Sequence, residues 1–284
     1  MFNQNIKSPV NIPVSKIHPF EGNPYKVLDN DEMNNLICSI QEQGVLTPII
    51  IRPIESTDEY EVISGHRRLH ATVKAGMKEV PAFIYAVTRD EAAIMLVDSN
   101  LHREHILPSE KAVAYKLKLD ALNHQGKTSA QVGQKWSVEQ VAEESSDSRS
   151  QIQRYIRLTY LIPELLDLVD EEKIALTPAV ELSYLTDEEQ YSLLGTIEEE
   201  DRTPSLSQAV RFKKLSQAGE LSDESIETIM QEDKANQKPM FKVSMERLQK
   251  VAPKVKDKDF EDFVLKACEH YYRYLQRQRN RDAR

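Results

Sequence analysis

The stretch Ser64-Gly65-His66-Arg67-Arg68 combines residue types that can bind a phosphate group. Residues 60–63 before it are typical of a short buried strand, and residues 69–75 after it predict a helix that ends at Gly76. Glycine allows the backbone to approach a ligand closely, free N–H groups at a helix start attract anions, and arginine grips phosphate oxygens in pairs. The stretch therefore predicts a phosphate pocket for a nucleotide. The alternative is an ordinary strand–turn–helix with solvated arginines.

A second set of polar residues lies on a predicted pair of short helices. Two Ser-x-x-Gln capping boxes, which begin at Ser137 and Ser148, open helices over 138–144 and 149–160. Two short helices joined by a tight turn are the sequence form of a helix-turn-helix. The apolar residues expected to pack these helices together are Val138, Val141, Ala142, Ile152 and Ile156.

The second of these helices has an outer face without acidic residues. No Asp or Glu lies between Ser148 and Leu158, in a chain whose formal net charge is -9. Arginine can read guanine and glutamine can read adenine in the major groove of DNA. This face is therefore predicted to bind DNA, with a solvated amphipathic helix as the alternative. The predicted DNA-binding residues are Ser148, Arg149, Ser150, Gln151, Gln153, Arg154 and Arg157. Arg157 and Lys135 are expected to meet phosphates rather than bases.

Two histidines, His66 and His70, are four residues apart on one face of the helix that follows Gly65. That spacing can hold a metal ion. Arg67 occupies the position where zinc proteases carry a glutamate, however, and a guanidinium beside a metal cation is unfavourable. Hydrogen-bonded or solvated histidines are the favoured interpretation, and a metal site is the alternative.

The composition indicates a globular chain of two or three domains. Of its 284 residues, 40% are hydrophobic and 29% are charged. No apolar run is long enough to cross a membrane and no signal peptide is recognisable, so neither is expected. The two cysteines, Cys38 and Cys268, lie far apart in the sequence, which fits a reducing cytoplasm and argues against a disulfide framework.

The elements around the phosphate-binding stretch predict a small mixed α/β domain. Strands are expected over 10–14, 48–52, 60–63 and 80–85. An Asp29–Glu32 capping box opens a helix that ends before Gly44. After residue 85 the pattern is helical, with a flexible loop over 123–135, an acidic helical scaffold over 163–229, a linker over 231–239 and a further capping box at Ser205–Gln208. We divide the chain into a nucleotide-binding domain (1–107), a DNA-binding helical domain (108–230) and a C-terminal helical region (231–284). An aromatic stripe over 260–275 is either a dimer seam or a face packed on its own domain.

Four stretches of the chain resemble sequence elements of the ParB family of partition proteins, and they occur in the same order as in that family. Residues 39–49 resemble its first sequence box, and residues 64–68 followed by Val80-Pro81 resemble its second. Residues 99–112 resemble the third box, and residues 141–158 resemble its helix-turn-helix. The resemblance covers roughly residues 10–160 and is closest to the ParB-like proteins of mobile elements. It implies an α+β fold, in which a ParB/sulfiredoxin-like N-terminal domain precedes an all-α helix-turn-helix domain and a helical C-terminal region.

The resemblance also implies that the N-terminal domain binds CTP with Mg²⁺. Carried over position by position, the nucleotide-binding residues are Thr47, Gly65, His66, Arg67, Arg68, Asn100, Arg103 and Glu104. Asn100 would face the metal, and the arginines would face the phosphates. The family usually has Glu at the positions of His66 and Ser99, so two oxygen ligands suited to Mg²⁺ are replaced here. Whether the chain hydrolyses CTP as a CTPase is left open.

The partners implied by the resemblance are a palindromic site in double-stranded DNA, a second copy in a homodimer and a ParA-type ATPase. The implied setting is the bacterial cytoplasm, on a nucleoid or plasmid, with no membrane. Two alternatives remain, namely a transcriptional regulator of a mobile element and a ParB-fold nuclease or phosphohydrolase. Sulfiredoxin chemistry is not expected, because His66 stands where sulfiredoxins carry their cysteine and Cys38 lies on a different helix. The basic tail over 273–284 is a further candidate for DNA contact without sequence preference.

Overall fold

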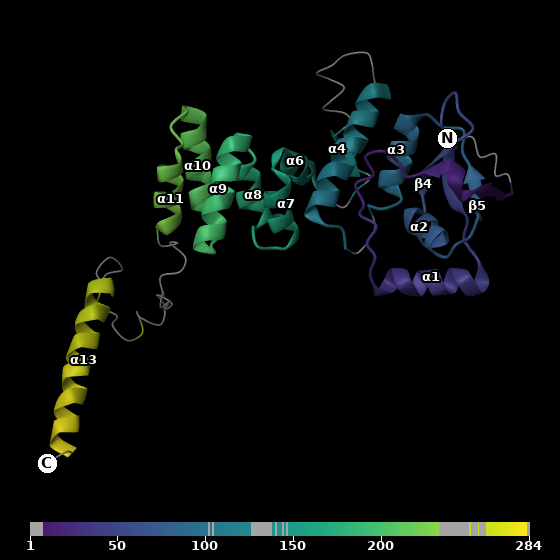
Figure 1. Cartoon of the computed structure of the whole chain (residues 1–284). Helices are drawn as coiled ribbons and strands as arrows, with labels where there is room; N and C mark the ends of the chain where they lie inside the picture. The colour runs from purple at the N-terminus through teal and green to yellow at the C-terminus, as the bar shows by residue number, and fades with distance from the viewer. Residues whose placement is uncertain are drawn as a thin grey trace. The chain divides into compact units, whose positions relative to one another are not determined.

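The computed structural model describes residues 8–101, 103, 105–125, 138–139, 141–143, 145, 147–232, 250, 255 and 260–282. The chain forms two compact units, Met1–Glu232 and Asp233–Arg284, and each is described by itself (Figure 1). The capping box at Ser137–Gln140, residues Glu104 and Lys135, and the predicted linker beyond Glu232 lie outside the described residues.

The N-terminal part of the first unit contains a five-stranded sheet. Its strands are β1 (Val10–Pro13), β2 (Ile17–His18), β3 (Ile49–Pro53), β4 (Tyr60–Ser64) and β5 (Glu79–Ile84). They lie in the order β1-β5-β3-β4-β2, with β3 parallel to β5 and antiparallel to β4. The segment Ile17–His18, predicted only as the exit from the first strand, forms an edge strand parallel to β4. A 3-10 helix, η1 (Val14–Lys16), turns the chain between β1 and β2.

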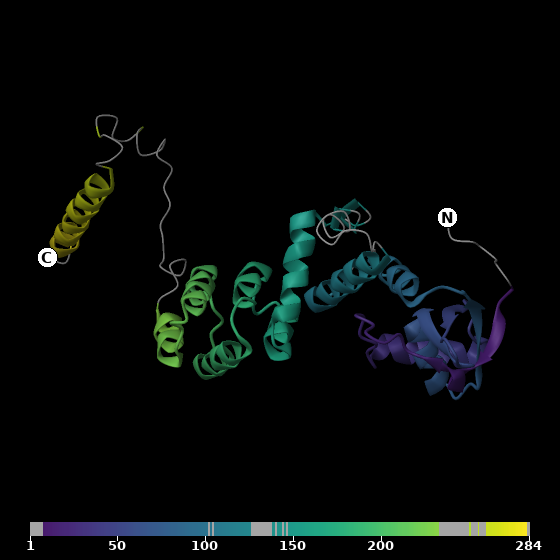
Figure 2. The ribbon, with the colours of Figure 1, turned by 90° about the horizontal axis from the view of Figure 1, so that it is seen from above.

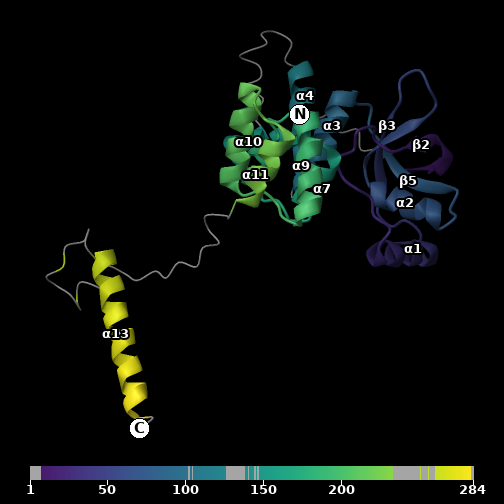
Figure 3. The ribbon, with the colours of Figure 1, turned by 60° about the vertical axis from the view of Figure 1, so that its left-hand side comes forward.

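Three helices accompany the sheet, namely α1 (Asp31–Gln43), α2 (His66–Lys74) and α3 (Arg89–Asp98). α2 packs on β3 and β5, and α1 packs on α2 (Figure 3). Met33, Ile40 and Ala71 join the two helices. Side chains alternate between the two faces of a strand, and those on the face covered by α2 are buried. They include the β-branched residues Ile49, Ile51 and Val62. This core fixes the end of β4, from which α2 starts.

The N-terminus of α1 differs from the predicted Asp29–Glu32 capping box. Asn30 is the N-cap, and its Oδ1 accepts a hydrogen bond from the N–H three residues further on at 3.0 Å. Asp29 instead pairs with two side chains of α2, His70 at 2.8 Å and Lys74 at 2.6 Å. The prediction was wrong because neighbouring Asp and Asn have the same capping chemistry. Only the tertiary contact with α2 distinguishes them.

The described elements of the first unit beyond Asp98 are helices (Figure 2). Its described helices are α4 (Pro108–Gln125), α6 (Arg149–Arg157), η2 (Leu158–Tyr160), α7 (Pro163–Asp170), α8 (Leu176–Leu182), α9 (Asp187–Glu200), α10 (Leu206–Ala218) and α11 (Asp223–Gln231). Ser148 caps α6 and Ser205 with Gln208 forms the capping box of α10, as predicted. The helix predicted over 149–160 ends one turn early, because its last three residues form η2. The architecture is the predicted α+β class, a mixed domain followed by helices.

The described part of the second unit is essentially one helix, α13 (Phe260–Asp282). Its predicted aromatic stripe is exposed within this unit, with Tyr271 61% and Tyr274 49% accessible. The rings of these two tyrosines stack with centroids 6.2 Å apart. Across the described ranges, no helix of the molecule is long and apolar enough to span a lipid bilayer.

Candidate nucleotide pocket and nucleic-acid interface

The turn between β4 and α2 requires a glycine. Gly65 is the residue before α2 and has a φ of 103°, in the left-handed region that side chains rarely adopt. A Cβ at this position would lie 2.8 Å from the Ile49 Cγ2 atom, so the sheet core leaves no space for one. The first N–H groups of α2, which have no partner within the helix, follow directly after this turn. The predicted combination of a tight turn and an anion-attracting helix start is therefore present at this position.

Three segments that are far apart in the sequence surround a cavity of about 210 Å³ beside this turn. They are the loop 23–27, the turn 64–68, and Asn100 with Arg103. The lining residues are Asn23, Tyr25, Lys26, Val27, Ser64, Gly65, His66, Arg67, Arg68, Asn100 and Arg103. Four of these described lining residues are lysine or arginine and none is a carboxylate. In a chain with a net charge of -9, this cavity is suited to an anion.

Most of the predicted nucleotide-binding residues meet at this cavity. Those that line it are Gly65, His66, Arg67, Arg68, Asn100 and Arg103. Thr47 does not line it, but its carbonyl and that of Pro48 each accept a hydrogen bond from Arg68 Nη1 at 2.7 Å. Sequence reasoning missed the loop 23–27. The available signal was a lysine and a tyrosine beside a turn-forming Asn-Pro pair, and that signal is weak without the fold.

The arginines of the turn differ in how firmly the protein holds them. The bonds to the Thr47 and Pro48 carbonyls fix Arg68, and its burial lowers the pKa of the guanidinium from the usual value. The Nη2 atom of Arg67 pairs with the exposed Glu32 of α1 at 3.0 Å. Arg103 lies over the ring of Tyr25, with its Cζ 5.8 Å from the ring centroid. Arg68 is thus preorganised, whereas Arg67 can exchange its carboxylate partner for a ligand oxygen.

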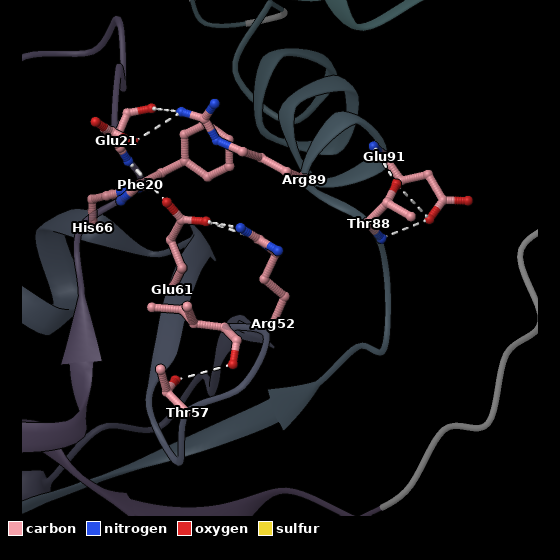
Figure 4. Close-up of polar contacts among 10 residues, drawn as sticks. Phe20, Glu21, Arg52, Thr57, Glu61, His66, Thr88, Arg89 and Glu91 are labelled. Carbon is pink, nitrogen blue, oxygen red and sulfur yellow. Dashed lines mark hydrogen bonds and ion pairs between the residues drawn. The ribbon is translucent and has the colours of Figure 1, made fainter. Parts of the chain in front are cut away.

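His66 is a hydrogen-bond acceptor in this site (Figure 4). Its Nε2 atom accepts a hydrogen bond from the Phe20 N–H at 3.4 Å. Burial lowers the pKa of His66 to about 4, an effect that nearby Glu61 opposes and Arg103 reinforces. The imidazole is therefore neutral near pH 7 and brings no positive charge to the pocket. The other member of the predicted metal pair, His70, contacts Asp29, and the part of the chain described here contains no group of three or more potential metal ligands.

A buried ion pair lies close to His66. Arg52 of β3 donates from Nε and Nη2 to the Glu61 Oε2 atom of β4, each at 2.7 Å. The other oxygen of Glu61 accepts a hydrogen bond from the Glu21 N–H at 3.0 Å (Figure 4). Together with the contact between His66 and Phe20, this holds two consecutive amides of the segment that leads into the loop 23–27. The sheet therefore positions one wall of the pocket through side chains.

Asn100 is the predicted contact to a metal ion. Its Nδ2 atom donates to the Leu96 carbonyl at 2.8 Å and to Ser99 Oγ at 3.1 Å. These bonds orient the amide, whose carbonyl oxygen is the ligand type that Mg²⁺ prefers. Since no carboxylate is found among the described lining residues, a magnesium ion here would depend mainly on phosphate oxygens of a ligand. The residues therefore fit a metal–triphosphate better than a bare ion.

Lys26 joins the pocket to the helical part of the unit. Its backbone N–H donates to Glu110 Oε1 of α4 at 2.9 Å. Its Nζ atom lies 3.7 Å from an oxygen of Asp167 and 3.8 Å from one of Asp170, both on α7. Asp170 also accepts hydrogen bonds from the backbone and hydroxyl of Ser109 at the start of α4. A residue of the pocket wall is thus connected to α4, the helix on which α6 packs.

The predicted inner face of the helix-turn-helix is confirmed. Val138, Val141, Ala142, Ile152 and Ile156 belong to one cluster with Tyr115 of α4. Asp147, which sequence reasoning missed, fixes the segment before α6 because it accepts hydrogen bonds from the Tyr115 hydroxyl at 2.6 Å and from Lys111 at 3.0 Å. The core therefore holds α6 with its polar face outward.

The predicted DNA-binding residues of α6 divide into two groups. Near its N-terminus, Ser148, Ser150, Gln151 and Gln153 are exposed or partly exposed, and Arg149 pairs with Glu139 at 3.1 Å. At the C-terminal end, one arginine binds α8 and another binds the residue that follows α8. Arg154 donates to Thr177 Oγ1 at 2.5 Å, and Arg157 donates to Ser183 Oγ at 3.0 Å and to its carbonyl at 2.8 Å.

Two family models match successive parts of the first unit. The ParB N-terminal domain matches residues 3–101, and the ParB HTH domain matches residues 104–207. The nucleoid occlusion protein of Listeria innocua is 32% identical over 197 residues, which are 69% of this chain and 65% of that protein. The chromosome-partitioning protein Spo0J of Thermus thermophilus is 32% identical over 202 residues, which are 71% of this chain and 70% of that protein.

A solved structure is similar over a comparable range. It is the C-terminally truncated ParB of Caulobacter crescentus complexed to the centromeric parS site, with 20% identity and a TM-score of 0.41. The match covers 78% of this chain and 98% of that structure. The matched region is about two thirds of the length of the curated relatives. From the two successive domain matches and the Thermus relative, we conclude that this chain belongs to the ParB family.

Proposed function

We propose that this protein is a site-specific DNA-binding protein of DNA partition, which reads duplex DNA with α6 and binds CTP in the cavity beside Gly65. The observation that carries the proposal is the outer face of α6, which has no carboxylate of its own and is held outward by a buried inner face. Family relatives that are named chromosome-partitioning and nucleoid occlusion proteins support the same role.

The exposed side chains at the N-terminal end of α6 suit base reading. In a helix-turn-helix the N-terminal residues of the second helix contact base edges in the major groove. Arg149, Gln151 and Gln153 offer the donors and acceptors that distinguish guanine and adenine there. Arg149 would exchange its ion pair with Glu139 for a contact with a base. Before DNA binds, this ion pair holds the guanidinium in place.

The cavity beside Gly65 suits the triphosphate of CTP. The start of α2 and the side chains of Arg67, Arg68 and Arg103 would bind phosphate oxygens, and Asn100 would contribute an oxygen to Mg²⁺. Mg²⁺ would neutralise part of the phosphate charge. Because His66 and Ser99 replace two carboxylates of the family pattern, we propose binding rather than hydrolysis as the role of this cavity.

The exposed stripe of α13 suits self-association. The exposed side chains of Phe263, Tyr271, Tyr274 and Leu275 share one side of α13, and the two tyrosine rings stack within the helix. A second copy would cover this stripe and would place two α6 helices on a palindromic site, since the symmetry of a dimer matches that of a palindrome. We therefore propose a homodimer formed through α13.

Selection from random duplexes, followed by a mobility-shift titration with the enriched sequence, tests the proposal. Arg149→Ala is expected to weaken specific binding by about 1–3 kcal/mol, or roughly 5- to 150-fold in Kd. Arg211→Ala is a matched control, because Arg211 is similarly exposed (48% against 43%) and also pairs with a glutamate. It should leave the affinity unchanged. No enriched sequence, or equal binding by Arg149→Ala and the wild type, would reject the proposal.

A further inference from the structure

Beside the C-terminal end of α6, three cations and two tyrosine rings alternate at the surface. The order is Lys116, Tyr160, Arg157, Tyr184 and Lys213, and we call this set the cation–aromatic row. The Lys116 Nζ atom lies 5.6 Å from the centroid of the Tyr160 ring. Arg157 Cζ lies 4.4 Å from that centroid and 3.9 Å from the centroid of Tyr184, and Lys213 Nζ lies 3.7 Å from the latter. The row crosses α4, η2, α6, the turn after α8, and α10.

The centre of the row is rigid. Arg157 lies between the two rings and donates to the hydroxyl and the carbonyl of Ser183. Ser183 is buried and donates to the Val180 carbonyl at 2.7 Å. These bonds and the two flanking rings hold the arginine in place, and the arginine keeps the two rings apart. Preorganised charges and rings cost little conformational entropy when a ligand binds.

The rings themselves remain in water. Tyr160 is 55% exposed and Tyr184 is 40% exposed. A single exposed tyrosine is ordinary, but two of them combined with three cations form a positive aromatic surface in a chain with a net charge of -9. Among the residues that the structure describes, Glu181 is the one acidic side chain that pairs with a member of the row, and it lies 2.9 Å from Lys213. The row thus keeps a local excess of positive charge.

We propose that the cation–aromatic row binds the phosphodiester backbone of the duplex that α6 reads, an inference that rests on the proposed DNA-binding function. The row is continuous with the outer face of α6, because Arg157 belongs to both. In homeodomains the C-terminal end of the recognition helix contacts the DNA backbone, and lysines and tyrosine hydroxyls are usual donors to phosphate oxygens. Lys116 and Lys213 meet phosphates on either side of Arg157, and the exposed rings lie against the sugars.

Salt dependence of DNA binding tests this assignment. Each phosphate contact releases counterions and contributes about 0.9 to the slope of log K against log salt. Lys116→Gln and Lys213→Gln should therefore each lower the slope by about 0.9 and weaken binding to specific and random duplexes alike. Lys214→Gln is the matched control, since Lys214 is the exposed neighbour of Lys213 on α10 and lies outside the row. Its slope should equal that of the wild type.

Two further variants separate charge loss from other effects. Glu181→Gln releases Lys213 from its ion pair and should tighten DNA binding. In the double variant Glu181→Gln/Lys213→Gln no acid is left unpaired, so the slope should still fall by about 0.9. Circular dichroism melts of each variant show that the fold is retained.

Equal slopes for Lys116→Gln, Lys213→Gln, Lys214→Gln and the wild type would overturn the assignment while DNA binding persists. Absence of any sequence preference in the wild type is a different result, because it rejects the proposed function itself. A lower affinity of Glu181→Gln for DNA would also contradict the assignment.

Discussion

At the scale of single residues, His66 is neutral although it lies among four cationic side chains. Burial lowers its pKa to about 4, whereas the unfolded chain takes up this proton near the usual pH 6.5. Between these pH values mainly the unfolded state binds the proton, which favours unfolding. The free energy of unfolding is therefore unaffected by His66 above pH 6.5 and decreases as the pH falls toward 4. The loss amounts to at most about 3 kcal/mol in the free energy of unfolding.

Urea unfolding at several pH values between 7 and 4 measures this effect. His66→Gln retains an acceptor for the Phe20 N–H but does not titrate, so its stability should fall less than that of the wild type over this range. Other titrating groups cancel in the difference between the two proteins. Parallel pH profiles for both proteins would contradict a buried neutral imidazole.

Gly65 is a residue-scale requirement of the turn. Gly65→Ala forces a side chain into the left-handed region and against Ile49, with an expected cost of about 1–3 kcal/mol in unfolding free energy. Gly76→Ala is the control, since Gly76 has a φ of 76° and open space where a Cβ would lie. It should lose only about 1 kcal/mol. If both variants are equally stable, Ile49 does not restrict the turn.

At the scale of elements, β3 and β4 are joined by the buried pair of Arg52 and Glu61. Removing one partner leaves the other charge buried, so Arg52→Met should lower the free energy of unfolding by about 3–5 kcal/mol. Arg52→Met/Glu61→Met removes both charges and should recover part of this loss. Its affinity for nucleotide should nevertheless be lower than that of the wild type. The reason is that the Glu21 N–H, which holds the segment before the loop 23–27, loses its acceptor. A single variant as stable as the wild type would show that the pair is solvated.

The predictability of the elements depended on how local their signals are. The turn at Gly65 and the start of α6 could be predicted, because a glycine beside a change of periodicity and a serine cap act within a few residues. The pocket wall could not. The segment from Phe20 to Lys26 is fixed by Glu61, His66 and Glu110, which are 40, 46 and 84 residues away from their partners in the sequence. No pattern of near neighbours contains such contacts, and the same holds for Asp29 and its partners on α2.

At the scale of the whole molecule, the second unit is expected to control the oligomeric state. Deletion of residues 233–284 removes α13 and should give a monomer in sedimentation equilibrium, whereas the full chain should sediment as a dimer. Tyr271→Lys/Tyr274→Lys should have the same effect by placing charge in the seam. A full-length monomer, or a dimer that survives both changes, would place the self-association elsewhere.

Calorimetric titration of the full chain with CTP and Mg²⁺, with and without DNA, measures whether the cavity beside Gly65 binds a nucleoside triphosphate. ATP and GTP are titrated in parallel to establish the base preference. We expect one site for CTP, an affinity lower by about tenfold or more in Arg67→Ala, and no change in Lys74→Ala, whose side chain lies on the same helix but pairs with Asp29 away from the cavity. No binding heat with any triphosphate, or an equal affinity for CTP in Arg67→Ala and the wild type, would rule out a triphosphate site beside Gly65.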